Sequence, residues 1–214
     1  MRSVTRDGVT FRVRDEMAVW AQFWDQFEAG SWEPQTTALF DDILRPGKLL
    51  VDFGAWIGPT ALWAANRGAR VIAIEPDPVA REALEDNIAA NDFDELVDVV
   101  AGAISTQTGS AHLYHAPVGE FGDARSRLTA RGITVRTWTL PDLLAEKGIS
   151  PEDVSLVKMD VEGLETMLCP TLGPWLAEHG ISAMIELHGG YPEPQWFADF
   201  GVVRYPAGAL VVRP

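Results

Sequence analysis

Three carboxylates stand where an apolar segment gives way to a predicted helix, in the string VKMDVEGLETM at residues 157–167. Asp160 closes the predicted strand, Glu162 lies in the turn and Glu165 falls in the first helical turn. Neighbouring carboxylates repel each other unless a proton or a cation lies between them. We therefore expect Asp160 and Glu162 to be catalytic. Glu165 has a simpler interpretation, because an acid at a helix N-terminus gains about 0.3–1 kcal/mol from the helix dipole.

A second polar group ends the predicted strand SAMIELHG, where Glu186 and His188 are two residues apart. In an extended strand such residues lie on the same face. If this strand is a neighbour of the one that ends at Asp160, the three side chains converge. One hypothesis makes His188 or a nearby carboxylate the general base. The other makes Asp160, Glu186 and His188 ligands of Mg²⁺ or another divalent cation.

The turn DFGAWIG, residues 52–58, is a candidate cofactor site that differs from a dinucleotide-binding turn. The dinucleotide pattern G-x-G-x-x-G has a second glycine, which lets the backbone approach a pyrophosphate. Trp56 stands at that position here, and an acid precedes the first glycine, so a bound phosphate is disfavoured. The residues that we predict to contact a cofactor in this turn are Asp52, Gly54, Ala55, Trp56 and Gly58.

A cofactor with adenosine, no phosphate and a cationic tail fits these residues, and S-adenosylmethionine has that structure. Glu75 lies at the end of the next predicted strand, 21 residues after Gly54, close to the ~20 expected for a ribose-binding acid. Its carboxylate can accept hydrogen bonds from both ribose hydroxyls. Asp77 and Ala103, which also follow strands, complete the predicted cofactor-binding set. The alternative, that Asp52 and Glu75 only cap helices, stays open at this stage.

These residues all follow strands of a predicted α/β fold. Apolar strands alternate with helices, as in a doubly wound, mostly parallel sheet that is covered on both faces. Ligands bind beyond the carboxyl ends of the strands in such sheets. The C-terminal segment GVVRYPAGALVVRP predicts a hairpin and hence an antiparallel edge. The predicted strands are 48–54, 70–76, 96–104, 133–140, 154–160 and 182–189, and the predicted helices are 59–68, 78–92, 141–147 and 171–179.

The N-terminal segment predicts a cap on this sheet. It combines a short strand at 9–13 with helices at 15–28 and 34–44. Trp20, Trp24 and Phe27 lie along one side of the first helix, and we interpret them as core residues. The predicted organisation is therefore an N-terminal strand and helical cap at 1–45, followed by a cofactor-binding core at 46–214.

Composition limits the classes of partner. The net charge is −14, with 31 acidic against 17 basic residues, which disfavours a nucleic-acid partner. No apolar run reaches the roughly 20 residues of a membrane helix, and no secretory signal is recognisable. The single cysteine, Cys169, has no second cysteine with which to form an internal disulfide. We expect a cytoplasmic protein without a nucleic-acid or membrane partner, with a homodimer left open.

Four segments in order resemble the FkbM-type S-adenosylmethionine-dependent methyltransferases: VDFGAWIGPTAL, AIEPDP, TWTLPDLLAEKGISPEDVSLVKMDVEGLETML and AMIELHG. The resemblance covers about residues 48–190 and is most specific in the string K-x-D-x-E-G-x-E, which begins at Lys158. It implies a Rossmann-like class I methyltransferase fold with the acidic turn in the active site. In that family the first loop usually reads D-x-G-A-N-x-G, so Trp56 replaces an asparagine.

The resemblance implies transfer of a methyl group to a hydroxyl of a small molecule, such as a sugar or a natural-product scaffold. Three alternatives remain at this stage. One is N-methylation of an amine or a peptide. The others are a nucleotide-binding oxidoreductase and a non-catalytic binding module on the same fold. The missing glycine pattern disfavours the oxidoreductase, and a Trp56 side chain that filled the cofactor pocket would favour the module.

Overall fold

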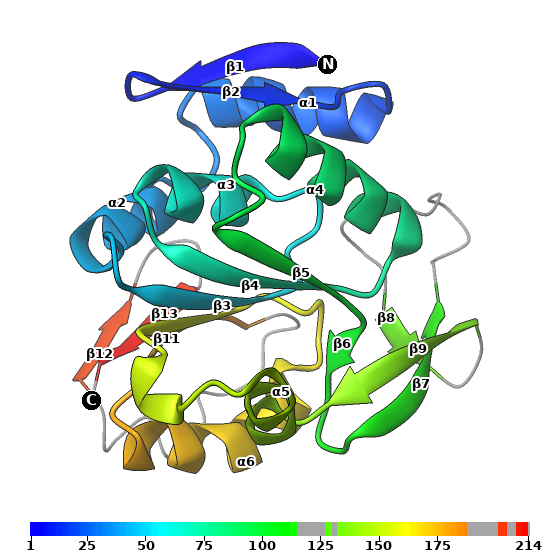
Figure 1. Cartoon of the computed structure of the whole chain (residues 1–214), viewed down its shortest axis with the longest axis vertical. Coiled ribbons are helices and arrows are strands. Elements are labelled where there is room, and N and C mark those ends of the chain that lie inside the picture. Colours follow the sequence, from blue (N-terminus) through cyan, green and yellow to red (C-terminus); the bar gives the residue numbers. More distant parts are fainter. Residues whose placement is uncertain (115–126, 130–131, 188–200, 205–208, 214) are drawn as a thin grey trace.

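A central seven-stranded sheet forms the middle layer of the molecule (Figure 1). The computed structural model describes residues 1–114, 127–129, 132–187, 201–204 and 209–213. The strand order is β12-β13-β11-β10-β3-β4-β5. The strands are β3 (Leu49–Phe53), β4 (Arg70–Glu75), β5 (Val97–Ala101), β10 (Leu156–Met159), β11 (Ser182–Glu186), β12 (Gly201–Arg204) and β13 (Ala209–Arg213).

The topology of this sheet confirms the predicted α/β class. Strands β11, β10, β3, β4 and β5 are parallel, whereas β13 pairs antiparallel with β11 and with β12. The C-terminal hairpin and antiparallel edge are therefore as predicted. From β3 the chain continues outward to β4 and β5, then returns to β10 on the other side. This reversal of strand order creates a crevice between β3 and β10, the usual place for a ligand in a doubly wound sheet.

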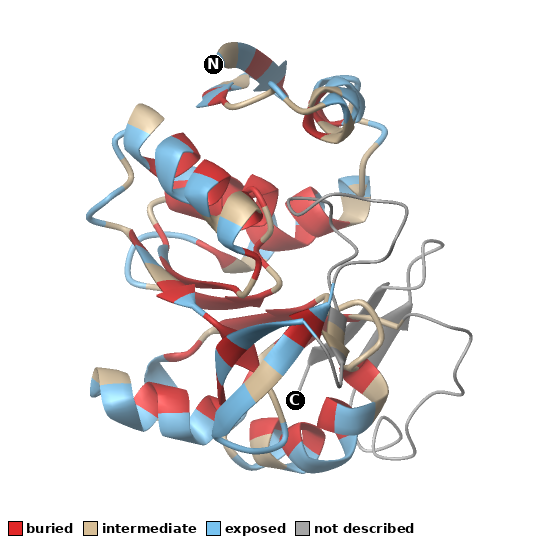
Figure 2. Ribbon diagram, turned by 90° about the vertical axis from the view of Figure 1, so that its right-hand side faces the viewer, coloured by how far each residue is buried: buried red, intermediate tan, exposed pale blue. Residues whose placement is uncertain are grey.

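Helices cover both faces of the sheet, and a short 3₁₀ turn, η1 (Pro151–Asp153), precedes β10. The side chains of successive β3 residues pack on opposite faces of the sheet. Leu50 belongs to one apolar cluster, while Leu49 and Val51 belong to the other. Burial on both faces explains why the strands read as continuous apolar runs, and Figure 2 shows the sheet buried between the layers. The helices are α2 (Pro34–Ile43), α3 (Pro59–Asn66) and α4 (Pro78–Ala90) on one face, with α5 (Leu140–Lys147) and α6 (Glu165–Glu178) on the other.

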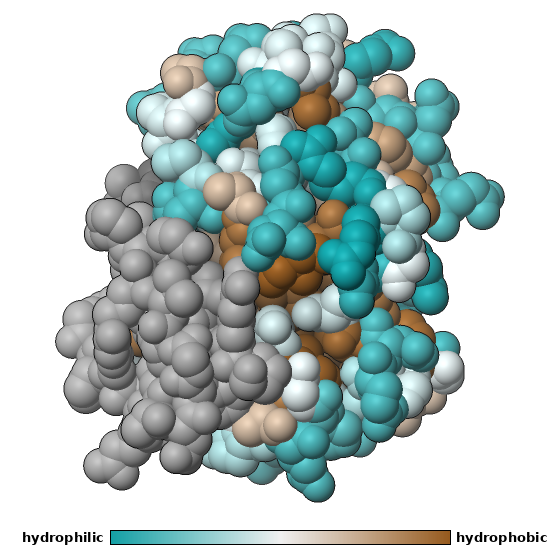
Figure 3. Space-filling view, turned by 90° about the vertical axis from the view of Figure 1, so that its left-hand side faces the viewer, coloured by the Kyte–Doolittle hydropathy of each residue, from teal (hydrophilic) through white to brown (hydrophobic). Residues whose placement is uncertain are grey.

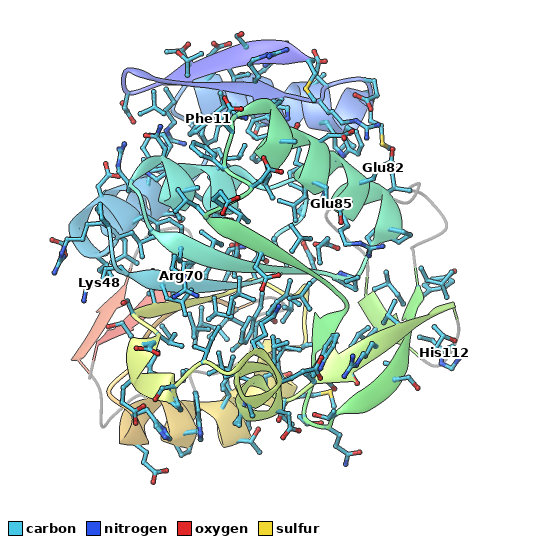
Figure 4. All side chains as sticks on the ribbon, viewed as in Figure 1. Phe11, Lys48, Arg70, Glu82, Glu85 and His112 are labelled. Carbon is cyan, nitrogen blue, oxygen red and sulfur yellow. The ribbon has the colours of Figure 1, made fainter. Side chains whose placement is uncertain are left out.

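The N-terminal residues form an outer layer over α3 and α4. A hairpin of β1 (Arg2–Arg6) and β2 (Val9–Val13) precedes α1 (Ala18–Glu28). Phe11 points from the hairpin toward the helices (Figure 4), and its ring centroid lies 6.2 Å from that of Trp63 on α3. The sequence predicted β2 and both helices but not β1, and α1 begins three residues later than expected. The division into a cap at 1–45 and a core at 46–214 stays a prediction.

A second, four-stranded sheet beside the first was not predicted. Its order is β6-β9-β7-β8, with β6 (Ala103–Ile104), β7 (Gly109–Tyr114), β8 (Arg127–Thr129) and β9 (Ile133–Trp138). The predicted strand at 96–104 is in fact two strands that separate at Gly102. A Cβ atom at Gly102 would lie 2.5 Å from the Arg136 carbonyl oxygen, so the close approach of β9 requires glycine there. The strand predicted at 133–140 belongs to this second sheet.

Helix α6 begins at Glu165, which agrees with the prediction that Glu165 lies in a first helical turn but is six residues before the predicted range 171–179; the helix contains Pro170 and Pro174. Cys169 is buried within it. No helix in the described part of the chain combines the length and apolarity needed to cross a membrane.

Lys48 and Arg70 mark the side of the molecule where β3 and β4 begin (Figure 4). That side shows hydrophobic atoms at the centre of a mostly hydrophilic surface (Figure 3).

Candidate active site

A cavity of about 420 Å³ lies at the carboxyl ends of β3, β4 and β10. Its volume falls within the ~300–1,000 Å³ of small-molecule sites. The cavity is lined by the turns after these strands, the first residues of α3, the end of β11, residues of the second sheet, and the N-terminal segment from α1 to Glu33. The cavity therefore stands at the predicted crevice.

The glycine turn and the acidic turn are in direct contact at the base of this cavity. Gly54 has a φ of +75°, and a Cβ atom there would lie 2.1 Å from the Asp160 carbonyl oxygen. Gly58, with a φ of +94°, precedes α3, and its Cβ atom would lie 2.6 Å from a Leu84 methyl group. Both glycines are thus required by space and by backbone conformation. Gly54, Ala55 and Trp56 line the cavity.

Trp56 adopts a left-handed conformation with φ of +49°, which is uncommon for a residue of this size. Asparagine adopts this conformation more readily. This explains why asparagine is the usual residue at this position in the FkbM-type methyltransferases that the sequence resembles. The indole ring stands edge-on to Phe23 of α1, with centroids 4.7 Å apart and an interplanar angle of 84°. Trp56 thus contributes one wall of the cavity and connects the glycine turn to α1.

Glu75 has the position and hydrogen-bonding capacity of a ribose-binding residue. It lines the cavity, is 5 % exposed, and accepts hydrogen bonds from the backbone N–H groups of Trp56 (2.7 Å) and Asp77 (2.8 Å). Each carboxylate oxygen can accept a second bond. Burial raises the pKa of Glu75 to about 7, against the lowering effect of these two N–H groups.

Asp77 acts as the N-cap of α4, because its Oδ1 accepts hydrogen bonds from the Val79 and Ala80 N–H groups. It does not line the cavity, so the structure connects it to the site through the hydrogen bond from its N–H to Glu75. Its predicted contact with the cofactor stays a prediction. Ala103, by contrast, lines the cavity together with Ile104 and Leu113 of the second sheet. These apolar residues suit the face of an adenine ring.

Asp52 is fully buried beneath the glycine turn and does not line the cavity. Its Oδ2 accepts a hydrogen bond from Thr60 (2.5 Å), and its Oδ1 lies 3.6 Å from the Lys158 Nζ. Burial raises the pKa of Asp52, and the Lys158 ammonium offsets part of this effect. The predicted role of Asp52 beside the cofactor is thus indirect in the structure, through Thr60 and Lys158, both of which line the cavity.

Lys158 is a functional candidate to which no role was assigned from the sequence. Its Nζ lies 3.3 Å from both Asp160 Oδ2 and the Gly54 carbonyl oxygen. Burial lowers the pKa of Lys158, but the charges of Asp160 and Asp52 outweigh burial and raise it above its usual value. Lys158 is therefore protonated at neutral pH. The signal that could have found it is a lysine within an otherwise apolar strand, two residues before an acid.

The three carboxylates of the acidic turn have two different environments: two of them line the cavity, and the third is buried in the turn. Asp160 and Glu162 both line the cavity, and Glu162 has a left-handed backbone with φ of +52°. Glu165 is fully buried, and its two oxygens accept hydrogen bonds from the backbone N–H groups of Val161 (2.9 Å) and Gly163 (3.0 Å). Glu165 thus holds the turn at the start of α6, as the simpler interpretation expected.

Strand β11 pairs in parallel with β10, so the condition for Glu186 to lie near Asp160 is met. Glu186 at the end of β11 lines the same cavity as Asp160. His188 lies outside the described residues. Within the described ranges, no group of three or more His, Cys, Asp or Glu side chains is placed to hold a metal ion.

One face of α1 also lines the cavity, which was not predicted from the sequence. The residues are Val19, Gln22, Phe23 and Gln26, at helical spacing. Trp20, Trp24 and Phe27 are buried on the other side of this helix, as expected of core residues. Apolar and amide side chains alternate along the cavity face.

Together, the sheet order, the glycine turn, Glu75 and the apolar wall define a class I methyltransferase whose residues fit S-adenosylmethionine. The Methyltransferase FkbM domain matches residues 52–205. The chain belongs to the FkbM methyltransferase family. This membership disfavours the oxidoreductase alternative. The family match begins at Asp52, so α1 and its cavity face lie outside it.

A curated relative, the ribosomal protein L11 methyltransferase of Chloroflexus aurantiacus, is 31% identical over 85 residues. The match covers 39% of this chain and only 25% of that protein.

Solved structures share the fold at low identity. A hypothetical protein of Thermus thermophilus has a TM-score of 0.51 and 18% identity, with 96% of this chain and 93% of that chain covered. The C-terminal domain of precorrin-6Y C5,15-methyltransferase from Rhodobacter capsulatus has a TM-score of 0.50 and 16% identity, with 84% and 86% covered. An FkbM methyltransferase from Methylobacillus flagellatus has a TM-score of 0.45 and 18% identity, with 82% of this chain and 45% of that chain covered.

Proposed function

We propose that this methyltransferase transfers the methyl group of S-adenosylmethionine to a hydroxyl group of a small molecule, such as a sugar or a natural-product scaffold. The observation that carries the proposal is the position of Asp160 in the cavity, in contact with the glycine turn. An alcohol must lose its proton during the transfer, whereas the sulfonium already activates the methyl carbon. A carboxylate beside the reacting atoms serves as the base.

In this reaction the acceptor oxygen bonds to the methyl carbon while the carbon–sulfur bond breaks, and S-adenosylhomocysteine leaves. Asp160 takes the hydroxyl proton. Lys158, whose Nζ lies 3.3 Å from Asp160 Oδ2, orients this carboxylate. Glu162 and the cavity face of α1 hold the acceptor, and exclusion of water by Phe23 and Trp56 protects the transfer.

Activation of the acceptor by a divalent cation is a second form of the same proposal. Asp160 and Glu186 both line the cavity, and carboxylate oxygens are the ligands that Mg²⁺ prefers. His188 would be the third ligand. Activity that is lost with a chelator and restored by Mg²⁺ would support this form, whereas activity that persists with the chelator would favour Asp160 as a simple base or an amine acceptor.

The test uses methyl-labelled S-adenosylmethionine and a panel of sugars, hydroxylated ring compounds and amines. Asp160→Asn should retain the fold, by circular dichroism, yet lose labelling of any hydroxyl acceptor by about 100-fold or more, as for loss of a general base. Asp153→Asn, which alters an exposed carboxylate of η1, is the matched control. Labelling of amines alone would refute O-methylation, and full activity of Asp160→Asn would refute its role as the base.

A further inference from the structure

The charges around the cavity are strongly unequal. Among the described residues that line it, Lys158 is the only basic side chain. The carboxylates that line it are Glu33, Glu75, Asp160, Glu162 and Glu186. S-adenosylmethionine carries two positive groups, which suit such a lining, and also one carboxylate, which such a lining repels. The carboxylate requires a cationic partner.

Lys158 is placed to be that partner. It lies on β10 directly beside Asp52 of β3, and its side chain is only 7% exposed. An ammonium that served only to neutralise Asp52 would lie closest to Asp52. Instead, the Nζ is 3.6 Å from Asp52 Oδ1 but 3.3 Å from the Gly54 carbonyl oxygen and from Asp160 Oδ2. The ammonium is thus displaced toward the glycine turn, under which the methionine end of the cofactor belongs.

The ammonium has three N–H donors and three acceptors within reach, so a ligand anion must share or replace one of them, and the lengths of these contacts allow this. Charge-assisted hydrogen bonds from nitrogen to oxygen are usually about 2.7–2.9 Å long, and all three contacts of Lys158 are longer. A lysine buried between two acids is also weak evidence for a purely stabilising role, because apolar residues often stabilise such positions as well or better. Binding of an anionic ligand would explain the presence of a buried lysine at position 158, whereas a contribution to stability does not.

We propose that the Lys158 ammonium binds the carboxylate of the methionine moiety of S-adenosylmethionine. This proposal rests on the proposed function, since it assumes the same cofactor. It makes Lys158 a cofactor-binding residue that also orients Asp160. The positively charged Lys158 ammonium would then lie between two negative groups, the cofactor carboxylate and Asp160.

Calorimetric titration with two ligands tests this role without an acceptor. S-adenosylmethionine and its decarboxylated form share the adenosine, the sulfonium and the amine, and differ in the carboxylate. We expect the wild-type protein to prefer S-adenosylmethionine by about 10- to 100-fold, the range for a hydrogen bond between charged groups. The double variant Asp52→Asn/Lys158→Met should lose this preference through weaker binding of S-adenosylmethionine alone. Asp52→Asn is the matched baseline and should keep the preference.

A direct measurement on the wild-type protein covers the case in which the double variant does not fold. The sequence has three lysines, so ¹³C-labelled lysine side chains give a spectrum that Lys48→Arg and Lys147→Arg assign by elimination. S-adenosylmethionine should shift the Lys158 resonance more than the decarboxylated ligand does.

Equal affinity of the wild-type protein for both ligands would overturn the role of Lys158 but not the proposed cofactor. An equal loss of affinity for both ligands in the double variant, relative to Asp52→Asn, would reduce Lys158 to a structural residue. Failure of the wild-type protein to bind either ligand would overturn this role and the proposed function together.

Discussion

At the scale of single residues, we predict that Glu75 makes cofactor binding depend on pH. Its pKa is raised to about 7 by burial, from an ordinary value of 4.5. Both ribose hydroxyls act as donors only toward the ionised carboxylate. Binding therefore favours the deprotonated form, which is a minority below pH 7. The raised pKa of Glu75 also affects folding. The free energy of unfolding falls as the pH rises from about 4.5 to 7, because Glu75 loses its proton in the unfolded state before it does so in the native state.

We predict that the affinity for S-adenosylhomocysteine increases about tenfold between pH 6 and pH 8, in line with the ionised fraction of Glu75. Glu75→Gln should bind about 10- to 100-fold more weakly at pH 8 and show no such dependence. Calorimetry at several pH values measures both quantities. A wild-type profile as flat as that of the variant would show that Glu75 does not bind the ribose.

Trp56 shows what sequence alone could and could not predict about a residue. Its position in the cofactor turn was predicted from the glycines on either side. Its left-handed backbone and its contact with Phe23 were not, because both depend on how α1 packs against the turn. The same limit applied to Lys158, since its partners Asp52 and Asp160 come from different segments.

At the scale of elements, the turn between β10 and α6 depends on Glu165. We predict that Glu165→Ala lowers the free energy of unfolding by about 1–3 kcal/mol, because two half-buried backbone N–H groups lose their acceptor. Urea denaturation measures this change. Glu178→Ala, at the exposed end of the same helix, should change stability by less than about 0.5 kcal/mol. Similar losses in the two variants would show that the turn is held by other contacts.

The two sheets differ in how well sequence predicts them. Strands β3, β4 and β10 of the central sheet are buried on both faces, so their apolar runs are unmistakable. Strand β7 is mostly exposed and β6 has two residues, so neither carries a strong pattern. The second sheet forms through pairings between distant segments, as in β6 with β9. Local patterns do not encode such pairings.

At the scale of the whole molecule, Cys169 reports on the integrity of the fold. It is buried in α6, and burial raises the pKa of its thiol to about 12. We predict that native protein shows almost no reaction with a thiol reagent at pH 8, whereas protein in urea reacts with one equivalent, since Cys169 is the single cysteine. Rapid labelling of the native protein would indicate that α6 opens locally.

The contact between Phe23 and Trp56 has a consequence for how this enzyme can evolve. Phe23 belongs to α1, outside the family match, whereas Trp56 belongs to the cofactor turn inside it. On the proposed function, a substitution that reshapes α1 for a new acceptor also alters the packing of the turn proposed to hold the cofactor. We therefore expect acceptor range and cofactor affinity to change together, so that engineering one requires selection on both.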